Sequence, residues 1–277
     1  MTKSTLNVKG NLISLDSPLV MGILNINPDS FFSESRTQTP DLIKAKAAKM
    51  LGDGASIIDI GGYSTRPGAA EVTQREETNR VILAVETILK EFPETVISVD
   101  TFRSAVAKAG IEAGAAIIND VSGGLLDEEM FATVAKLRVP YILMHMRGTP
   151  QTMSNLTNYD NLLVDVCTEL DAQLAKLKAL GVADVVLDPG FGFAKTVEQN
   201  YEMLKNLSYF QRFNLPVLAG LSRKSMIYKT LGNSAEEALN GTTALNMAAL
   251  INGAKILRVH DVKEATETVK LYNQIYA

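Results

Sequence analysis

Eight short apolar runs cross this chain, and nearly every one ends on a polar residue that is capable of chemistry or recognition. The runs do not alternate apolar with polar residues, and strands of that kind are buried on both faces, as in a parallel sheet. Segments with helical periodicity separate them. The pattern therefore predicts an α/β fold, the closed (β/α)8 TIM barrel, with strands at 19–24, 56–60, 96–99, 116–118, 141–144, 185–187, 217–220 and 256–259.

A short N-terminal β-hairpin is expected before the barrel. Leu6–Val8 and Leu12–Ser14 are apolar runs around a Lys9-Gly10-Asn11 turn, and such a hairpin could plug the bottom of the barrel. The length of 277 residues is close to the roughly 250 residues typical of one barrel, so we expect a single domain over residues 1–277. Helices are predicted at 40–50, 73–89, 102–113, 127–137, 159–180, 196–213, 235–252 and 262–275.

Composition excludes several classes of partner. Hydrophobic residues make up 46% and charged residues 21%, as in ordinary packed domains, and the net charge of −4 leaves no electrostatic footprint for nucleic acid or an anionic membrane. The one cysteine, Cys167, falls in a predicted helix and reads as a buried thiol. The N-terminus has no apolar signal core and no run approaches the ~20 residues of a membrane span, so we expect a cytoplasmic protein.

Acidic and amide side chains follow three of the predicted strands. Asp100, Asn119 and Asp188 each come directly after a buried run, where an ionised carboxylate is costly unless it is paired or hydrogen-bonded. Two explanations fit: the acids could bind a metal, or they could accept hydrogen bonds from an N–H-rich ligand. His145 and His260 are the only histidines, and neither lies at zinc-ligand spacing from the acids, which makes a permanent zinc site improbable. A planar heterocycle with amide-like edges would satisfy all three residues.

Cations also fall near the predicted mouth of the barrel. An acidic protein that gathers positive charge at strand ends should bind an anion there, and phosphate or pyrophosphate is the natural candidate. Two long, helix-poor connections, 25–39 and 61–71, could close over the mouth. The cations are Arg66, Lys195, Arg223, Lys224 and Arg258.

The segment from Asp188 to Lys195 is a strand end followed by a glycine turn with two aromatic rings, Phe191 and Phe193. Its glycines let the backbone approach a ligand, and an exposed phenylalanine offers a flat face to a ring. Ser222, followed by two cations, reads as a binding lip. No Ser-His-Asp chain order supports a nucleophilic role for Ser222.

Seven motifs in order resemble those of the dihydropteroate synthase family, and together they span Gly22 to Val262. They lie at 22–31, 59–68, 98–101, 118–124, 188–193, 222–225 and 258–262. The resemblance implies a pterin-binding TIM barrel that joins 6-hydroxymethyl-7,8-dihydropterin pyrophosphate to p-aminobenzoate, giving 7,8-dihydropteroate and pyrophosphate in folate biosynthesis. It also implies that sulfonamides bind at the aminobenzoate site.

The resemblance assigns roles to residues at the matching positions. It makes Asp100, Lys224 and Arg258 catalytic, and adds Asn119 and Asp188 to these three as the pterin contacts. The pyrophosphate falls to Asn25, Arg66, Arg258 and His260, with Mg²⁺ as cofactor attached through Asn25. The aminobenzoate site would be bordered by Thr65, Pro67, Phe31, Phe191 and Ser222.

A dissociative mechanism fits the absence of an obvious nucleophile. Mg²⁺ and the cations would stabilise departing pyrophosphate, the electron-rich pterin would support positive charge on its methylene, and the aromatic amine would then attack. Three departures from the family pattern stand out: Asn27 where threonine is common, Phe32–Ser35 in place of a glycine-rich continuation, and Ala194 where glycine is usual. The first two affect closure of the first loop, and the third stiffens the aromatic turn.

Two other functions compete with this interpretation. A methyltetrahydrofolate-binding methyltransferase would share the barrel but would have little use for a pyrophosphate pocket. A catalytically silent pterin-binding protein should have lost Asn25, Arg66 or Lys224, and all three are present. Small apolar residues occur around much of the circumference of the predicted helix Ala235–Asn252. An outer helix packs on the barrel through one apolar stripe only, so the additional apolar surface predicts a homodimer contact. The family resemblance also implies a homodimer.

Overall fold

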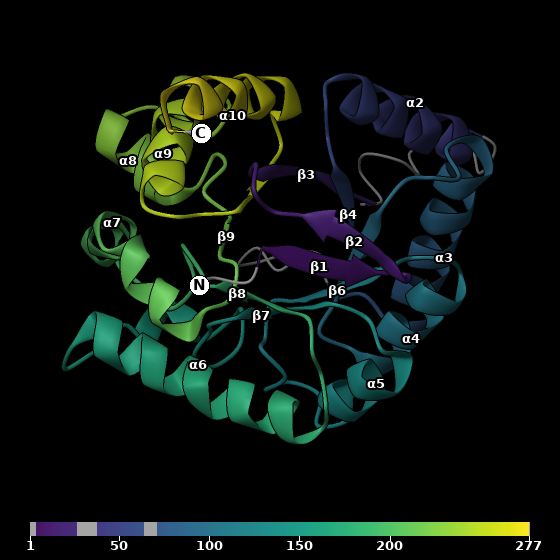
Figure 1. Cartoon of the computed structure of the whole chain (residues 1–277), viewed down its shortest axis with the longest axis horizontal. Helices are drawn as coiled ribbons and strands as arrows, with labels where there is room; N and C mark the ends of the chain where they lie inside the picture. The colour runs from purple at the N-terminus through teal and green to yellow at the C-terminus, as the bar shows by residue number, and fades with distance from the viewer. Residues whose placement is uncertain (1–3, 27–37, 64–70, 277) are drawn as a thin grey trace.

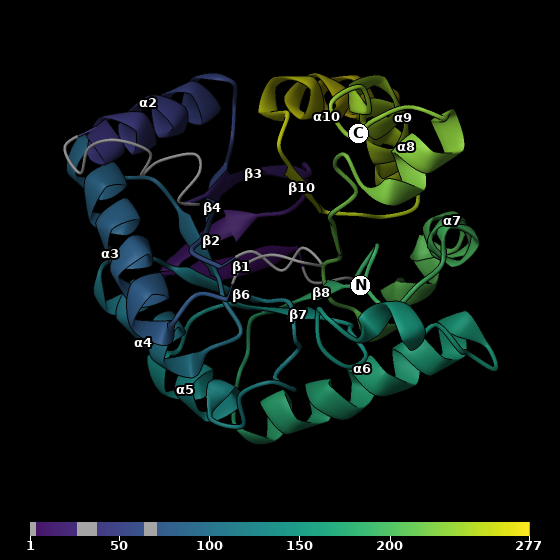
Figure 2. The same ribbon diagram turned by 180° about the vertical axis from the view of Figure 1, so that it is seen from behind.

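The computed structural model describes residues 4–26, 38–63 and 71–276. Eight parallel strands form one sheet in the order β8-β7-β6-β5-β4-β3-β10-β9, and a bridge between Leu187 and Val217 joins the two ends of that order. The predicted (β/α)8 barrel is thereby confirmed, and helices surround the strands in both views (Figures 1 and 2). The barrel strands are β3 (Leu19–Asn25), β4 (Ile57–Gly61), β5 (Ile97–Asp100), β6 (Ile117–Asp120), β7 (Tyr141–Met144), β8 (Val185–Asp188), β9 (Leu218–Ala219) and β10 (Ile256–Val259).

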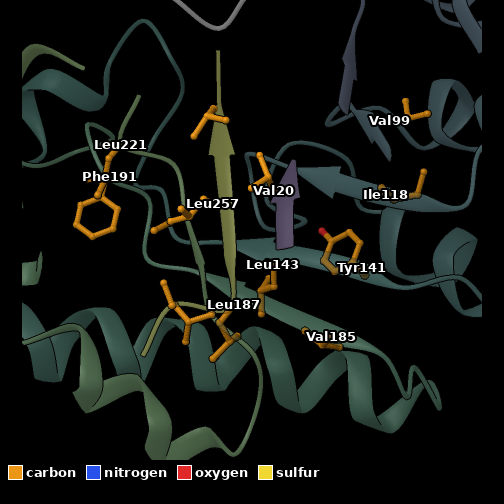
Figure 3. Packing of buried hydrophobic residues seen from close by; sticks show 14 of the residues in the cluster. Val20, Val99, Ile118, Tyr141, Leu143, Val185, Leu187, Phe191, Leu221 and Leu257 are labelled. Atoms are coloured by element: carbon orange, nitrogen blue, oxygen red, sulfur yellow. The ribbon is translucent and has the colours of Figure 1, made fainter. Parts of the chain in front are cut away.

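The strands are buried on both faces, as their unbroken apolar runs predict. Alternate residues point outward against the helices, and Figure 3 shows Val20, Val99, Ile118 and Leu257 among the buried side chains of this outer layer. The opposite residues of the same strands, such as Met21 and Ile117, belong to a second buried cluster. This two-sided packing holds the strand ends, and therefore the polar residues that follow them, in fixed positions.

The N-terminal hairpin crosses the barrel end where the strands begin. Strands β1 (Thr5–Val8) and β2 (Asn11–Ser14) pair antiparallel around Lys9 and Gly10, which both have positive φ, as a tight hairpin turn requires. Leu6, Val8 and Leu15 pack with residues at the starts of the barrel strands. The hairpin lies across the ring in Figure 1 and confirms the expected plug. The functional residues must therefore meet at the other end.

The helices follow the predicted pattern, with two corrections. Residues 196–213 form helix α7 (Val197–Lys205) and then a 3-10 helix (Leu207–Phe213), and a short helix, α8 (Ser225–Leu231), was not predicted. Capping side chains set several starts: Thr73 accepts from the Glu76 amide, and Thr196 with Gln199 forms a capping box. The other helices are α2 (Gln38–Gly52), α3 (Gln74–Glu91), α4 (Ser104–Glu112), α5 (Met130–Leu137), α6 (Leu162–Ala179), α9 (Leu239–Ile251) and α10 (Val262–Tyr276).

Within the described ranges, the helices are too short or too polar to cross a bilayer.

Candidate active site

Arg258 lies at the centre of a buried charged cluster at the C-terminal ends of the strands. Its side chain leaves β10, and its Nε donates to Asp59 Oδ2 on β4 at 2.6 Å while a terminal nitrogen donates to Asp100 Oδ2 on β5 at 2.5 Å. Asn119, on β6, donates its side-chain amide to the same Asp59 oxygen at 2.9 Å. Residues as far apart in sequence as 59 and 258 thus form one hydrogen-bonded group because their strands end at the same rim.

Asp188 and Lys224 extend this cluster along β8 and the loop after β9. The Gly190 amide donates to Asp188 Oδ1 at 2.7 Å, and the Lys224 ammonium donates to the Phe191 carbonyl. A Cβ added at Gly220 would lie 4.0 Å from both Arg258 Cβ and Asp188 Oδ2, which places these two residues on either side of the same strand end. The expectation that Asp100, Asp188 and Lys224 share a single rim is confirmed.

The cluster contains more acidic than basic side chains, three aspartates against Lys224 and Arg258. Burial raises the pKa of Asp188 and raises that of Asp100 to about 7, although Lys224 and Arg258 respectively oppose the change. Burial lowers the pKa of Lys224 to about 8, with Asp188 opposing. For Arg258, burial would lower the pKa, but Asp59 and Asp100 outweigh it and raise the value. Three carboxylates around two cations favour a ligand that donates N–H bonds.

One acceptor within the cluster is left unused. Asp59 Oδ1 is buried and has no hydrogen-bond partner among the residues that the structure describes, although Oδ2 of the same carboxylate accepts from both Arg258 and Asn119. Asp59 lies inside the apolar run at 56–60, and the sequence motifs alone assign it no role. Its position was the available signal, because a charge inside a buried strand needs a partner.

Asn25 and the Ser222–His260 pair complete the described rim. Asn25 ends β3 opposite Gly61, and a Cβ on Gly61 would lie 2.9 Å from Asn25 Oδ1 and 3.9 Å from Asp100, so glycine keeps this corner open. Ser222 Oγ lies 3.0 Å from His260 Nδ1 and accepts from the His260 amide at 3.1 Å. Asn25, Ser222 and His260 therefore lie at the ends of strands or just beyond them, as predicted.

Two of the five cations expected at the mouth are engaged by protein groups rather than directed at a ligand. Arg223 donates to both carboxylate oxygens of Asp261, at 2.8 and 2.9 Å, and to the Ala235 carbonyl at 2.9 Å. These contacts connect the loop after β9 to the segments around residues 235 and 261. Lys195 is 8% exposed, and its ammonium lies beneath the glycine turn against His145. Lys224 and Arg258 remain with the acids, and Arg66 lies outside the described residues.

The aromatic turn also corrects one residue. Phe191 is fully buried in the core, as Figure 3 shows, so it does not offer the exposed ring that the sequence predicts. Phe193 is the partly exposed ring, and the Lys224 ammonium lies 4.7 Å from its centroid. Ala194 has φ +49°, in the left-handed region where glycine is usual. The predicted contacts Phe31, Thr65 and Pro67, and the departures at 27 and 32–35, lie outside the described residues.

A second buried network was missed at the edge of the site. Glu77, in the first turn of α3, is fully buried and accepts from Thr101 Oγ1 at 2.6 Å. Arg103 donates to Glu77 at 2.6 Å and to the Val72 carbonyl at 3.0 Å. This network ties α3 to the segment that directly follows Asp100, and only three-dimensional proximity reveals it.

Comparisons with known proteins agree with this geometry. The family described as "Pterin binding enzyme" matches residues 21–260. The chain is 44% identical over 266 residues to the dihydropteroate synthase of Escherichia coli K12, and the alignment covers 95% of this chain and 93% of that protein. The solved Yersinia pestis dihydropteroate synthase with a sulfonamide drug superposes with TM-score 0.90 at 39% identity, covering 98% of both chains.

A second solved structure, the Xanthomonas albilineans dihydropteroate synthase with 4-aminobenzoic acid, gives TM-score 0.91 at 35% identity and covers 100% of this chain and 99% of that one. Both comparisons extend over the strand ends that carry the charged cluster. The chain belongs to the dihydropteroate synthase family of pterin-binding enzymes.

Proposed function

We propose that the Asp59–Asp100–Arg258 cluster is the pterin site and that the chain condenses 6-hydroxymethyl-7,8-dihydropterin pyrophosphate with p-aminobenzoate at the rim beside it. The observation that carries this proposal is one guanidinium held by two carboxylates from different strands, at 2.6 and 2.5 Å. Two hydrogen bonds fix the plane of the guanidinium, and a fixed plane at the mouth suits stacking on a flat heterocycle.

The pterin edge would take up the acceptors that the cluster holds in excess. Its ring and amino N–H groups pair with Asp100 and Asp188, while its ring acceptors pair with Asn119 and the Lys224 ammonium. Among the described residues the Lys224 ammonium hydrogen-bonds one backbone carbonyl, that of Phe191, and lies over the Phe193 ring, so it would exchange a single hydrogen bond to meet a ligand. In the relative from Xanthomonas albilineans, a structure holds 7,8-dihydropteroate, the product expected of this reaction.

Asn25 suits a magnesium ion carried by the diphosphate. Its side chain has no hydrogen-bond partner among the described residues, and Gly61 leaves space around its oxygen. Mg²⁺ usually keeps several waters and takes few protein ligands beside substrate phosphates, so one amide oxygen fits the ion. Bound there, the ion would neutralise charge that develops on pyrophosphate. Arg66, Arg258 and His260 are proposed as the protein's own contacts to the diphosphate.

The reaction that we propose breaks the methylene C–O bond of the pterin substrate and forms a C–N bond to the aromatic amine. The bond electrons leave with pyrophosphate, and the amine loses one proton to solvent after attack. Arg258 would offer positive charge to the departing pyrophosphate oxygens. The protein groups that bind the pterin would hold its methylene in line with the attacking amine. Phe31, Thr65, Pro67 and Ser222 are proposed at the aminobenzoate site, with Phe193 in place of Phe191.

The test is to mix the protein with both substrates and Mg²⁺ and to assay pyrophosphate and dihydropteroate together. We expect both products in equal amounts, with loss of turnover on chelation and recovery on adding Mg²⁺. Lys224→Ala should cripple turnover while the chain still unfolds cooperatively. A silent pterin-binding protein would give binding heat in calorimetry without pyrophosphate. Across substituted anilines, a steep dependence of the chemical step on nucleophilicity would contradict the dissociative path.

A homodimer contact through the α8–α9 surface completes the proposal. Leu231 at the end of α8 and Ile251 at the end of α9 are 55% and 52% exposed, and Ala244 between them is also exposed. Exposed apolar side chains of this size suit an interface between copies. Sedimentation should show a dimer at micromolar concentration and a monomer after Ile251→Glu. A monomeric wild-type chain would refute this part of the proposal alone.

A further inference from the structure

Lys195 is a buried lysine that the proposed mechanism does not use. Its ammonium donates to the Gly190 carbonyl at 3.2 Å, to the Phe193 carbonyl at 3.1 Å and to His145 Nδ1 at 3.0 Å. A lysine has three N–H donors, so these three acceptors satisfy the ammonium completely. Two of the acceptors belong to the aromatic turn, residues 189–194, and the third belongs to the end of β7.

The contacts of His145 fix its protonation state. Because Nδ1 accepts from Lys195, the ring proton lies on Nε2, and Nε2 donates to Glu169 on α6 at 3.0 Å. Burial lowers the pKa of His145 to about 4, with the charge of Lys195 acting in the same direction. The imidazole is therefore a neutral link between the ammonium and a carboxylate, and it is not placed to act as a base.

The chain of contacts continues and closes on itself. Arg147 pairs with Glu169 through two nitrogens and lies over the Tyr159 ring, 3.9 Å from its centroid. The Tyr159 hydroxyl donates to the Ala194 carbonyl at 2.9 Å, and Ala194 precedes Lys195. We call Lys195, His145, Glu169, Arg147 and Tyr159 the support ring. It grips the turn at three carbonyls, those of Gly190, Phe193 and Ala194.

The opposite side of the same turn faces the pterin site. Gly190 donates its amide to Asp188, and the Phe191 carbonyl accepts from Lys224. The Gly190 and Phe193 carbonyls accept from Lys195, whereas the Phe191 carbonyl between them accepts from Lys224. Lys195 and Lys224 therefore hold the carbonyls of one short segment from two directions. A shift on the Lys195 side must move the partner of Lys224.

We propose that Lys195 is a positioning residue of this enzyme: through the aromatic turn, its ammonium sets where Lys224 meets the pterin. The inference rests on the proposed assignment of Lys224 to that ligand. The rest of the support ring acts through Lys195 and through the Ala194 carbonyl. The charged groups around Lys195 are Asp188, Lys224, Glu169 and Arg147, and burial lowers the pKa of Lys195 to about 7, with Asp188 opposing the change.

The test is a double-mutant cycle on kcat/KM for the pterin substrate, with Lys195→Met and Lys224→Met alone and together. Lys195→Met keeps the length of the side chain and removes the ammonium. We expect a loss of about 100-fold in the wild-type background, as a displacement of about 1 Å produces, and less than about threefold in the Lys224→Met background. The KM for p-aminobenzoate should change less than the KM for the pterin.

A milder pair of variants keeps the test decisive if Lys195→Met fails to fold. Tyr159→Phe removes only the hydroxyl that donates to the Ala194 carbonyl. This variant should raise the KM for the pterin about threefold in the wild-type background and should have no further effect in the Lys224→Met background. Tyr209→Phe is the control, because that hydroxyl bonds Arg212 on the 3-10 helix outside the barrel, and its kinetics should match wild type.

The outcomes separate the two proposals. The positioning role is overturned if the fold-losses in kcat/KM of Lys195→Met and Lys224→Met multiply in the double variant. It is also overturned if Lys195→Met and Tyr159→Phe both have wild-type kinetics. Neither result affects the proposed pterin site. Wild-type kinetics for Lys224→Met would instead overturn the proposed pterin site, and the inference would fall with it. A loss that disappears when Lys224 is already absent supports the inference.

Discussion

Gly190→Ala tests how tightly the aromatic turn is held against β7. Gly190 has φ +72°, and an added Cβ would lie 2.0 Å from the His145 carbonyl oxygen, which is backbone at the end of β7. That strand end cannot retreat easily, since the His145 amide donates to the Asp188 carbonyl at 2.9 Å. The turn itself must therefore move, and with it the amide that holds Asp188.

Gly232→Ala is a matched control for the backbone alone. Gly232 has φ +67° and nothing within 4 Å of an added Cβ. Left-handed backbone costs alanine about 1–2 kcal/mol, of which about 0.4–1 kcal/mol is offset by lost freedom in the unfolded chain, so this variant should lose about 1 kcal/mol. Gly190→Ala adds an overpacking cost of about 1–3 kcal/mol and should lose about 2–4 kcal/mol in total.

Urea unfolding and steady-state kinetics on both variants provide the measurement. Because the turn must shift by about 1 Å, kcat/KM for the pterin substrate should fall about 100-fold in Gly190→Ala and stay near wild type in Gly232→Ala. The contrary result is that the two variants have unfolding free energies within about 0.5 kcal/mol of each other and equal kinetics. That result would refute the claim that backbone contact with β7 fixes the turn.

Three further predictions concern single side chains. Asp59→Asn should destabilise the chain by about 2–3 kcal/mol in urea unfolding and raise the pterin KM, because Arg258 loses a buried charged partner. Burial raises the pKa of the Cys167 thiol to about 11, so Ellman's reagent at pH 8 should react with one thiol per chain only after denaturation. Burial would raise the pKa of Glu169, but hydrogen bonds from His145 and Arg147 lower it to about 2 from 4.5. A lowered carboxyl pKa stabilises the fold above pH 4.5, so the stability lost in Glu169→Gln should be constant there and should shrink as pH falls toward 2; a pH-independent difference would contradict the pairing.

The sequence was sufficient to predict the barrel and most of the cluster, for a simple physical reason. Strands buried on both faces appear as continuous apolar runs, and all parallel strands of a barrel end at one rim. Asp100, Asn119 and Asp188 follow such runs directly, so the fold alone brings them together. Arg258 lies within the last run, and its long side chain reaches across to Asp59 and Asp100.

Side-chain direction beyond the strand ends could not be predicted. The pattern of φ in the aromatic turn, positive at Gly190, Gly192 and Ala194, decides that Phe191 enters the core while Phe193 stays partly exposed. The order of glycines and phenylalanines in the sequence does not indicate which of the two rings is buried. Arg223 likewise has φ +56° and turns toward Asp261, although its neighbour Lys224 joins the cluster.

The arrangement of charge indicates what the site is built to do. Burying ion pairs rarely gains stability, because the desolvation of each charge offsets most of the attraction between the partners. The chain nevertheless buries three carboxylates around Arg258 and Lys224 and leaves Asp59 Oδ1 without a partner in the described part of the chain. A group with unsatisfied acceptors is stabilised most by a ligand that supplies donors, and such a ligand should raise the unfolding free energy by binding only the folded state. The desolvation cost of the cluster is therefore a source of selectivity: a flat ring without N–H donors on the matching edge would not offset that cost and would bind poorly.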